Sequence, residues 1–403
     1  MNTRPRPRLL VLNQYYWPGV EATAHLLTEL CEALAEDYDV RVVTGILHGH
    51  GDEPRRTVRN GVEIFRVPST SFERSKLAAR AANYLTYLGR ALGRALRGAR
   101  PDVVLCMTDP PMVGDIALIV ARRFRAPLLV ISEDVFPEIA LELKRLENPV
   151  LIGLLRGLVG LYLKRADRIV AIGETMRRRL EEKGAPPERL TVIPNWVDTN
   201  AITPQPRDNA WARKRRLRNA FVVMHSGNVG HAQNLDSLVR SATFLRDLDD
   251  LRILIVGFGA RHEELVALAK LHETDAVQFL PYQPRTALPQ SLSSADVHVV
   301  GLGSGLSGYV VPSRLYGILS AGRPVIVAAD PESETAQVVR SVGCGVVIPP
   351  GRPELLADAI RDLRARRGEL DELGARGRAY VVEEADRSVA IGRYRVLLEE
   401  LVA

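Results

Sequence analysis

The sequence predicts an α/β protein built from two Rossmann-like domains, each with a parallel sheet. Short apolar runs of strand length alternate with helical patterns along most of the chain, and such alternation produces parallel sheets covered by helices. The length of 403 residues and the 46% content of hydrophobic residues suffice for two cores of ordinary size. A segment at 198–218, rich in Pro, Asn, Asp and Arg and without a sustained period, separates the two series as an expected link.

The first series begins with an apolar run at 8–13, a helical pattern at 22–36 and a strand at 40–44, which is the start of a βαβ unit. Its further strands are predicted at 103–106, 128–132, 168–172 and 190–193. The second series has predicted strands at 221–225, 252–256, 277–280, 297–301, 325–328 and 345–348, followed by helical patterns. We therefore expect a first domain at 1–205, a second at 206–387, and a last helix within 388–403.

Composition limits the partners and the compartment. The formal net charge of +6 and the pI near 9.3 favour anionic partners without choosing among nucleotides, phospholipid surfaces and nucleic acid. No apolar run reaches the roughly 20 residues that span a bilayer. The four apolar residues after Arg8 are too few for the core of a signal peptide, so we expect a cytoplasmic protein. Three widely separated cysteines are expected to be buried free thiols: Cys31, Cys106 and Cys344.

The segment GYVVPSRLYGILSAGRPVI at 308–326 is the strongest candidate for a binding site. Pro312 has no backbone N–H and favours the first turn of a helix. The following amides, of Ser313, Arg314 and Leu315, should then be free at the helix N-terminus. Free amides, the helix dipole and the Arg314 guanidinium would together favour the diphosphate of a nucleotide sugar. The alternative is an ordinary helix-to-strand connection.

Several glycine-rich or polar segments follow predicted strands, and ligands of open parallel sheets bind beyond the carboxyl ends of the strands. Gly19 follows the first strand, and the loop SGNVG, from Ser226 to Gly230, follows the first strand of the second domain. Gly227 in this loop could let the backbone approach a phosphate, although such loops are also ordinary turns. With two domains facing one another, we expect the site in the cleft between them.

Acidic residues near these strand ends are candidates for catalysis or for contact with an acceptor hydroxyl: Glu21, Asp109, Asp134 and Glu138. Asp134 is the candidate for an acceptor hydroxyl. The others have structural alternatives, because Glu21 could be a helix-start acid, Asp109 a turn-stabilising side chain and Glu138 a solvated acid of a first helical turn.

No metal site is expected from the sequence. Asp247-Leu248-Asp249 matches a DxD pattern but lies in a polar connection before a strand, and no pair of histidines has ligand spacing. Gly257-Phe258-Gly259 lacks the third glycine of a dinucleotide fingerprint. It is expected to form a tight turn, with Arg261 pointing toward phosphate.

Two features suit an anionic membrane surface. A helical pattern at about 100° per residue brings several basic and tyrosine side chains to one face. They are Lys76, Arg80, Tyr84, Tyr87 and Arg94, flanked by Arg90 and Arg97. An almost wholly apolar helix follows at 149–163, interrupted by Arg156 and closed by two basic residues. The alternative is a solvated face beside a core helix. Nucleic acid is not an expected partner, because aromatic residues are not interleaved with the basic ones.

The chain resembles the family 4 glycosyltransferases of the GT-B fold over nearly its whole length. The segment at 308–326 resembles their donor-site signature. Four further regions carry the resemblance in order, namely QYYWPGVEATAHLLTEL, TDPPMVGDIAL with ISEDVFPEIA, ADRIVAIGETMRRRL with VIPNWVD, and HSGNVGHAQNLDSLV with LIVGFGARHEEL. Within the family the chain is most similar to bacterial O-antigen and capsule enzymes related to fucosaminyltransferases.

This resemblance implies transfer of a sugar from a nucleotide donor with retention of configuration, and without a metal or a cofactor. The implied donor is a UDP-N-acetylhexosamine, and the implied acceptor is a polyprenyl-diphosphate-linked or growing glycan at the cytoplasmic membrane face. The first domain would present the acceptor, and the second would hold the nucleotide with its base near Leu280, Pro281 and Tyr282. The final helix would cross back onto the first domain.

One departure from the family pattern concerns the diphosphate. The loop after the first strand of the second domain usually supplies an Arg and a Lys, and these positions are Asn228 and Gln233 here. Arg314 is then the main cationic candidate.

A second departure concerns the sugar. Two family glutamates, one touching the sugar and one the ribose, are replaced by Tyr309 and Gly317, so sugar recognition is expected from Tyr309, Ser307 or backbone amides. The loss keeps open a rival interpretation, a catalytically inactive relative that binds a partner glycosyltransferase. A small soluble acceptor is another alternative. An oxidoreductase would need a full GxGxxG followed by an acid, which neither domain has.

Overall fold

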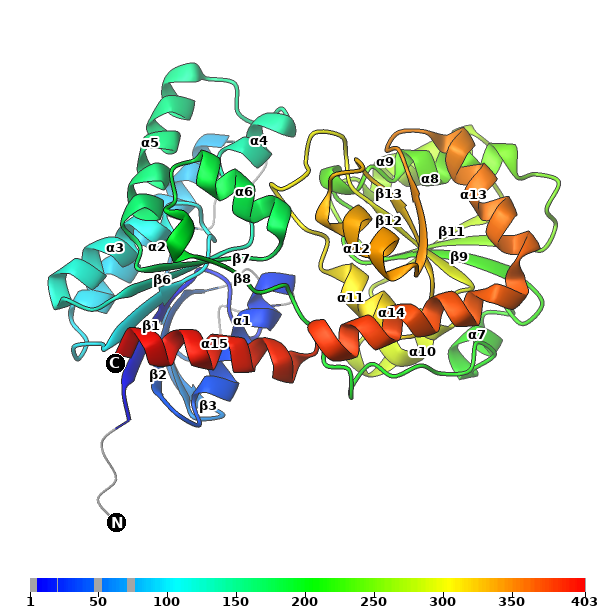
Figure 1. Ribbon diagram of the computed structural model, residues 1–403. Helices are drawn as coiled ribbons and strands as arrows, with labels where there is room; N and C mark the ends of the chain where they lie inside the picture. The colour runs from blue at the N-terminus through cyan, green and yellow to red at the C-terminus, as the bar shows by residue number, and fades with distance from the viewer. Residues whose placement is uncertain (1–5, 20, 47–52, 71–76, 403) are drawn as a thin grey trace, which may run out of the picture. The chain divides into compact units, whose positions relative to one another are not determined.

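The computed structural model describes residues 6–19, 21–46, 53–70 and 77–402. The chain divides into two compact units, one of Met1–Pro194 with Ile391–Ala403 and the other of Asn195–Ala390. Each unit contains one sheet flanked by helices (Figure 1). The predicted α/β class with two Rossmann-like sheets is confirmed.

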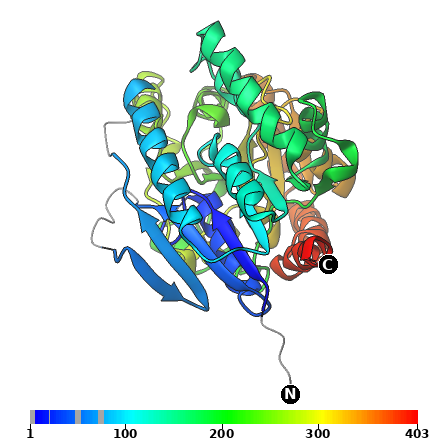
Figure 2. The same ribbon diagram turned by 90° about the vertical axis from the view of Figure 1, so that its left-hand side faces the viewer.

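The sheet of the first unit has the strand order β3-β4-β2-β1-β5-β6-β7-β8, and only the pair β3 and β4 is antiparallel among its described strands. The strands are β1 Arg8–Leu12, β2 Asp39–Gly45, β3 Arg56–Arg59, β4 Val62–Val67, β5 Val103–Cys106, β6 Leu128–Ser132, β7 Arg168–Ala171 and β8 Leu190–Val192. Helices flank this sheet on both faces (Figure 2). They are α1 Ala22–Leu34, α2 Leu77–Leu96, α3 Val113–Phe124, α4 Glu138–Glu142, α5 Pro149–Arg165 and α6 Glu174–Glu182, with part of α15 Arg387–Val402. All the strands predicted for this unit are present.

The hairpin of β3 and β4 was absent from the sequence prediction. Its two strands are joined by Asn60 and Gly61, which have φ values of 45° and 81°. An Asn-Gly pair with positive φ at both positions is the favoured two-residue hairpin turn. The signal was therefore present, although the short flanking strands alternate only weakly between apolar and polar residues.

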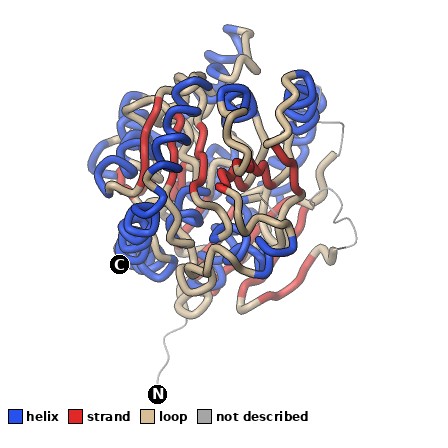
Figure 3. Tube along the Cα trace, turned by 90° about the vertical axis from the view of Figure 1, so that its right-hand side faces the viewer, coloured by secondary structure: helices blue, strands red, loops and turns tan. Residues whose placement is uncertain are grey.

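The sheet of the second unit is wholly parallel in its described strands, with the order β11-β10-β9-β12-β13-β14. The strands are β9 Phe221–Ser226, β10 Leu251–Val256, β11 Val277–Leu280, β12 Val297–Gly301, β13 Val325–Ala328 and β14 Gly345–Ile348. The helices are α7 Ala210–Lys214, α8 Asp236–Ser241, α9 His262–Leu271, α10 Leu288–Ser293, α11 Arg314–Ser320, α12 Glu334–Val342, α13 Pro353–Ala365 and α14 Leu370–Glu384. Figure 3 shows these strands between the helices. All six predicted strands are present.

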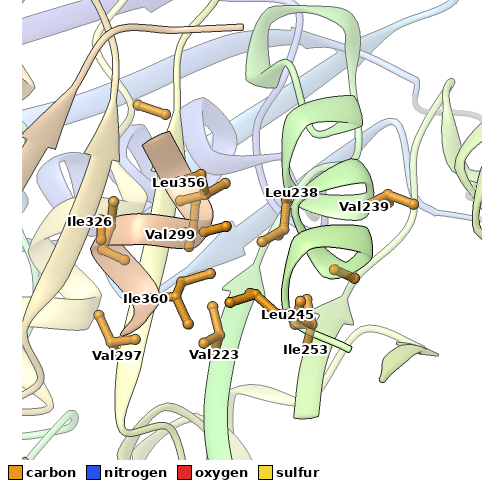
Figure 4. Close-up of a cluster of buried hydrophobic side chains, with 14 of the residues drawn as sticks. Val223, Leu238, Val239, Leu245, Ile253, Val297, Val299, Ile326, Leu356 and Ile360 are labelled. Atoms are coloured by element: carbon orange, nitrogen blue, oxygen red, sulfur yellow. The ribbon is translucent and has the colours of Figure 1, made fainter. Parts of the chain in front are cut away.

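The core of the second unit explains why its strands read as continuous apolar runs. Val223 and Val299 of neighbouring strands are buried against Leu238 of α8 and Ile360 of α13 (Figure 4). Because a parallel sheet is covered on both faces, residues on both sides of each strand must be apolar. This packing places the carboxyl ends of the strands along one edge of the sheet, where ligands of such sheets bind.

The segment at 198–218 is not a separate link, because all of it belongs to the second unit. Trp211 of α7 is buried in that unit, and Arg207 forms an ion pair of 2.8 Å with the buried Asp296. Asp296 also accepts from Arg367, so one carboxylate joins three separate parts of the unit. The polar composition that suggested a link thus reflects capping and ion pairing inside the unit.

Most of the last helix, α15, belongs to the first unit, which includes the residues from Ile391 onward. Arg395 of α15 donates to the carbonyl oxygen of Ala33 at 3.1 Å and pairs with Glu36 at 2.7 Å. These contacts hold the end of the chain against the C-terminal end of α1. The three cysteines are buried free thiols, as predicted.

The basic face predicted for α2 is not a single exposed stripe. Tyr87 is fully buried, and the guanidinium of Arg94 lies 3.5 Å from the centroid of the Phe65 ring. Arg90 of α2 and Arg97, directly after the helix, are exposed. Lys76 lies outside the described residues, as does the side chain of Arg80. The face of α2 that includes Tyr87 is the one that packs into the core of the unit, because burial of its apolar surface stabilises the helix against the sheet.

The carboxylate of Asp115 in α3 is shielded from solvent. Neither of its oxygens has a hydrogen-bond partner among the side chains and backbone groups of the described residues, apart from its own backbone N–H. Burial raises the pKa of Asp115 to about 7, and its own backbone N–H opposes this rise. One neighbour that covers this part of α3 is Tyr162 of α5, which packs over the preceding Gly114 so closely that an added Cβ would lie 2.7 Å from the ring.

We expect Asp115→Asn to stabilise the protein increasingly as the pH rises toward 7. A carboxyl whose pKa is raised in the folded state contributes stability that is fully present below its unfolded pKa of about 4 and is lost as the pH rises through the folded value. The free energy of unfolding of the variant, relative to the wild type, should therefore rise by about 2–4 kcal/mol between pH 4 and 7. Above that pH the difference should stay constant. Urea unfolding at pH 4 to 8 measures this difference.

The control is Glu147→Gln, which changes an exposed carboxyl group of the same unit. It removes a carboxylate charge at an exposed position, so a pH-dependent gain that is confined to Asp115→Asn reports the buried site. A constant difference for Asp115→Asn over the same range would contradict the prediction.

Candidate active site

Carboxyl groups gather at the carboxyl ends of β5 and β6 in the first unit. Thr108 Oγ1 accepts hydrogen bonds from the backbone N–H groups of Glu133 and Asp134, at 3.2 and 3.4 Å. Asp109 lies beside them and accepts from Thr23 Oγ1 at 3.5 Å. Burial raises the pKa of Asp134 to about 8, and the charges of Asp109 and Glu133 add to the rise. This edge therefore holds a carboxyl group that exchanges its proton near neutral pH.

Three other predicted residues of the first unit have different surroundings. The side chain of Glu21 is exposed and makes no capping hydrogen bond, although its carbonyl oxygen accepts from the N–H of His25 at 3.1 Å. Gly19 is buried and its N–H donates to Tyr16 in a tight turn. Glu138 pairs with Arg156 at 3.1 Å and with Lys183 at 2.5 Å, so it joins α4 to α5 and α6 rather than remaining solvated.

The glycines at the carboxyl edge of the second unit allow two loops to lie against each other. Gly227, after β9, donates its N–H to Val256 at 2.9 Å, and Val229 donates to Phe258 at 3.0 Å. A Cβ on Gly257 would lie 2.0 Å from the carbonyl oxygen of Gly227, and the φ of Gly257 is +138°. The expected tight turn at 257–259 thus packs against the loop at 226–230, and these contacts restrict the backbone of both loops.

Arg314, the first residue of α11, reaches these paired loops. Its Nη1 lies 2.7 Å from Nε2 and 3.2 Å from Nδ1 of His225, and its Nη2 donates to the carbonyl oxygen of Asn228 at 3.5 Å. The guanidinium lies directly against Gly227, 3.4 Å from the place of a Cβ. Among the described residues no carboxylate pairs with Arg314. Its positive charge is therefore held in place without being neutralised.

The protonation states follow from burial. His225 is completely buried at the end of β9, and burial, followed by the charge of Arg314, holds its pKa well below its usual range. Burial lowers the pKa of Arg314 to about 10, which leaves it charged at neutral pH. A neutral imidazole thus accepts from a charged guanidinium.

The start of α11 differs in part from the prediction. The N–H of Leu315 is not free, because it donates to the carbonyl oxygen of Pro312 at 3.3 Å. In the described chain the amides of Ser313 and Arg314 donate to no backbone carbonyl. The helix is only seven residues long, so we assign the cationic character of this edge to the Arg314 side chain.

The loop between β12 and α11 carries further predicted residues. Ser307 is 4% exposed and its Oγ donates to Asp330 Oδ2 at 3.4 Å, whereas Tyr309 is half-buried. Asp330 follows β13, and its carboxylate also accepts from Ser304 and from the N–H of Gly305. Ser307 is therefore held by the protein, whereas Ser304 and Gly305 are exposed.

Exposed aromatic side chains lie at the ends of β10 and β11. Tyr282, 55% exposed, donates through its hydroxyl to the carbonyl oxygen of Phe258 at 3.1 Å. Burial raises the pKa of Tyr282, and the nearby charge of Arg314 opposes the rise. Phe258 is itself 57% exposed, and the preceding Leu280 and Pro281 lead directly to Tyr282. Flat rings beside a cation suit a nucleotide base next to its phosphates.

Three side chains that the sequence analysis singled out have partners within the protein. Arg261, which was expected to point toward phosphate, pairs with Asp236 at 3.0 Å and with Glu264 at 2.8 Å. The Oε1 of Gln233, at the position of the family's lysine, accepts from the N–H of Gly230 at 2.9 Å and closes its own loop. Asp247 of the DxD pattern, where no metal was expected, pairs with Arg361 at 2.6 Å.

Sequence reasoning also missed His225, Phe258 and Asp330. His225 is a polar residue at the end of an otherwise apolar strand, immediately before the glycine loop, and this signal was available. Asp330 follows β13 at the same edge, so the strand-end argument would have included it. Phe258 carries no comparable signal, because only the fold shows that its ring is exposed.

Comparisons with known proteins show the family of the chain. The family model described as "Glycosyl transferase 4-like domain" matches residues 21–196, and that described as "Glycosyl transferases group 1" matches residues 208–380. The chain belongs to the group 1 glycosyltransferases. Its fold is the GT-B fold, and its activity is that of a nucleotide-sugar-dependent glycosyltransferase.

Two curated relatives have names from glycan biosynthesis. The "Probable glycosyltransferase WbjE" of Pseudomonas aeruginosa is 24% identical over 98% of both chains. The "Putative colanic acid biosynthesis glycosyl transferase WcaI" of Escherichia coli K12 is 30% identical over 49% of this chain and 50% of its own.

Solved structures support the fold. The Anabaena protein Alr3699/HepE, determined in complex with UDP, covers 98% of this chain and 100% of its own with a TM-score of 0.75 at 14% identity. Sucrose-phosphate synthase from Thermosynechococcus elongatus covers 98% and 99%, with a TM-score of 0.81 at 16% identity. At such low identity the likeness shows the GT-B fold alone.

We expect Gly257→Ala to destabilise this glycosyltransferase by about 1–3 kcal/mol or more, because the methyl group would overlap the Gly227 carbonyl and the backbone would be held in a strained region. Thermal unfolding measures the loss, and it should coincide with weaker nucleotide binding. The control is Gly368→Ala, where a Cβ meets nothing within 4 Å. Equal melting temperatures for the two variants would show that the paired loops are not constrained.

Proposed function

We propose that this glycosyltransferase moves an N-acetylhexosamine-type sugar from a UDP-linked donor to a polyprenyl-diphosphate-linked or growing glycan, with retention of configuration. The observation that carries the proposal is the guanidinium of Arg314, which lies against the glycine loop without a carboxylate partner among the described residues. A desolvated cation of this kind is stabilised by an anion, and a diphosphate supplies one with several acceptor oxygens.

The donor is proposed to lie along the carboxyl edge of the second unit. The base would contact the aromatic side chains at Phe258 and Tyr282, and the diphosphate would contact Arg314 and the backbone near Gly227. UDP is the proposed nucleotide, and the Anabaena protein of the same fold was determined with UDP. The amides of Ser313 and Arg314 are further donors for the phosphates.

The proposed catalysis is electrostatic. Negative charge develops on the diphosphate as the bond to the sugar breaks, and Arg314 would stabilise this charge from a preorganised position. The proposal includes no metal ion, since the guanidinium supplies the positive charge. In the first unit, Asp134 would bind the acceptor hydroxyl, and its raised pKa suits a group that takes up the hydroxyl proton.

The glycan acceptor rests on the relatives WbjE and WcaI and on the likeness to O-antigen and capsule enzymes. A fucosaminyltransferase-like specificity is the finer form of this proposal. An inactive binding subunit is the second candidate, favoured by Tyr309 and Gly317 at the positions of the two family glutamates.

Contact with an anionic membrane is also part of the proposal, and α5 supports it. Val150, Leu154 and Leu161 are 80%, 59% and 38% exposed, and at about 100° per residue they share one face of the helix. The first turns of α5 project from the sheet of their unit (Figures 1 and 2). No helix in the described part of the chain is long and apolar enough to cross a bilayer, so contact would be peripheral.

Basic residues continue the face of α5. Lys164 and Arg165 are exposed at its C-terminal end. A hollow of about 370 Å³ between the ends of α3 and α5 is lined in part by Arg122, Arg125 and Arg165. An apolar helix face that leads to several cations matches the layers of an anionic bilayer surface.

We expect Arg314→Ala to weaken UDP binding by about 1.5–3 kcal/mol, or roughly 10- to 150-fold, the cost of losing a charged hydrogen-bonding partner. Isothermal titration calorimetry with UDP, and with GDP to compare bases, measures the affinity. Arg246→Ala is the control, because Arg246 is exposed and donates to the carbonyl oxygen of His272. Unchanged UDP affinity in a folded Arg314→Ala protein would show that the diphosphate does not bind at Arg314. UDP binding without transfer to any acceptor would favour the inactive subunit.

We expect the wild type to co-sediment with anionic liposomes and the double variant Val150→Asp, Leu154→Asp to lose most of this binding. Each buried apolar side chain contributes about 1.5–3 kcal/mol and each nearby cation about 1 kcal/mol, and salt should weaken the cationic part. Leu271→Asp is the control, since Leu271 is 77% exposed on the second unit. Equal and negligible sedimentation with anionic and neutral liposomes would favour a small soluble acceptor.

A further inference from the structure

We infer that Asp330 is a positioning residue that shapes the loop between β12 and α11 and thereby sets the choice of donor sugar. The inference rests on the proposed function, because it concerns the sugar end of the same donor. Asp330 follows β13, whereas its partners follow β12.

The carboxylate of Asp330 holds one short stretch of this loop. Its Oδ2 accepts from the N–H of Gly305 at 2.8 Å and from Ser307 Oγ at 3.4 Å, and its Oδ1 accepts from Ser304 Oγ at 3.2 Å. One side chain thus satisfies three donors within four residues. A carboxylate has four lone-pair sites, so it can accept all three bonds, whereas a neutral side chain of the same size cannot.

Backbone hydrogen bonds also shape the loop, since the N–H of Leu306 donates to the carbonyl oxygen of Gly303 at 3.3 Å and the N–H of Tyr309 donates to that of Leu306 at 3.1 Å. Leu306 is 2% exposed and anchors the loop in the core, but Ser304 and Gly305 are exposed. At the base of the loop, Gly303 donates to the carbonyl oxygen of Ala232 at 2.8 Å. Gly305 has a φ of 80°, a conformation that glycine adopts freely. Without the carboxylate, the exposed turn would lose its direct link to the β13 side of the edge.

The order of strands indicates which part of the donor meets this loop. Along the sheet, the residues that follow β11, β10 and β9 are Tyr282, Phe258 and Gly227, in that order. The guanidinium of Arg314 lies against Gly227. The next strands in the same direction are β12 and β13. A UDP-sugar that places its base at β11 and its diphosphate at β9 must extend its sugar toward β12 and β13. The clamped turn at 304–307 is therefore the part of the edge that faces the sugar.

The turn itself offers groups that can recognise the hydroxyl groups of a sugar. Ser304 and Gly305 are exposed, and the half-buried Tyr309 follows two residues after the turn. These hydroxyl and amide groups can bind a sugar selectively when their orientation is defined. Asp330 acts through them and need not touch the sugar itself.

Asp330→Asn tests the inference, because the amide keeps the volume of the side chain but turns an N–H₂ group toward at least one of the three donors. Calorimetry compares UDP with UDP-glucose and UDP-N-acetylglucosamine. We expect UDP affinity within about twofold of the wild type and an affinity ratio between the two UDP-sugars that changes about tenfold. Hydrogen–deuterium exchange of a peptide covering 302–309 should become faster. Glu332→Gln, the neutralisation of an exposed neighbour, is the matched control and should change neither.

An unchanged ratio between the UDP-sugars would overturn the inference even if exchange became faster, since the role would then be structural. Unchanged exchange would overturn it as well, and so would an equal loss of UDP and UDP-sugar binding. A wild-type protein that binds none of the three ligands would instead refute the proposed function, and the exchange measurement would still decide whether Asp330 holds the turn.

Discussion

The carboxyl edge of the second unit's sheet depends on a guanidinium that is positioned without a neutralising carboxylate among the described residues. Burial of an unpaired charge is unfavourable, so Arg314 needs hydrogen-bond acceptors that carry no negative charge. His225 and the carbonyl oxygen of Asn228 provide them, and burial keeps the imidazole neutral. A carboxylate in the place of His225 would hold Arg314 more strongly, but it would also compete with a phosphate for the same charge.

The position of Arg314 follows from close helix packing behind it. An added Cβ on Gly374 of α14 would lie 2.0 Å from the carbonyl oxygen of Gly322, just beyond the end of α11. Arg378 of α14 donates to the carbonyl oxygens of Ser320 and Ile202, each at 2.9 Å. The short helix α11 is therefore fixed at its C-terminal end by backbone contact and by a guanidinium. The other end can then present Arg314 to the paired glycine loops.

The carboxyl edges of the two sheets carry different side chains. In the first unit, burial raises the pKa of Asp134, and the charges of Asp109 and Glu133 add to the rise. In the second unit, Arg314 lies against the glycine loop without a carboxylate partner among the described residues. The same α/β architecture supports both edges because only the residues after the strands differ.

The sequence by itself determined the fold class, because two-sided burial requires continuous apolar strands and these strands alternate with helices. The sequence also singled out Arg314, because it is a cation that directly follows Pro312 and Ser313 at the predicted start of a helix. Only the tertiary structure decided which cations are available, since Arg261 meets Asp236 and Glu264 whereas Arg314 meets a histidine 89 residues away. In the same way, the fold brought Asp330 to the turn at 304–307 and buried the tyrosine face of α2. Charge and burial depend on partners that are distant in sequence, and the pattern of one chain segment does not contain them.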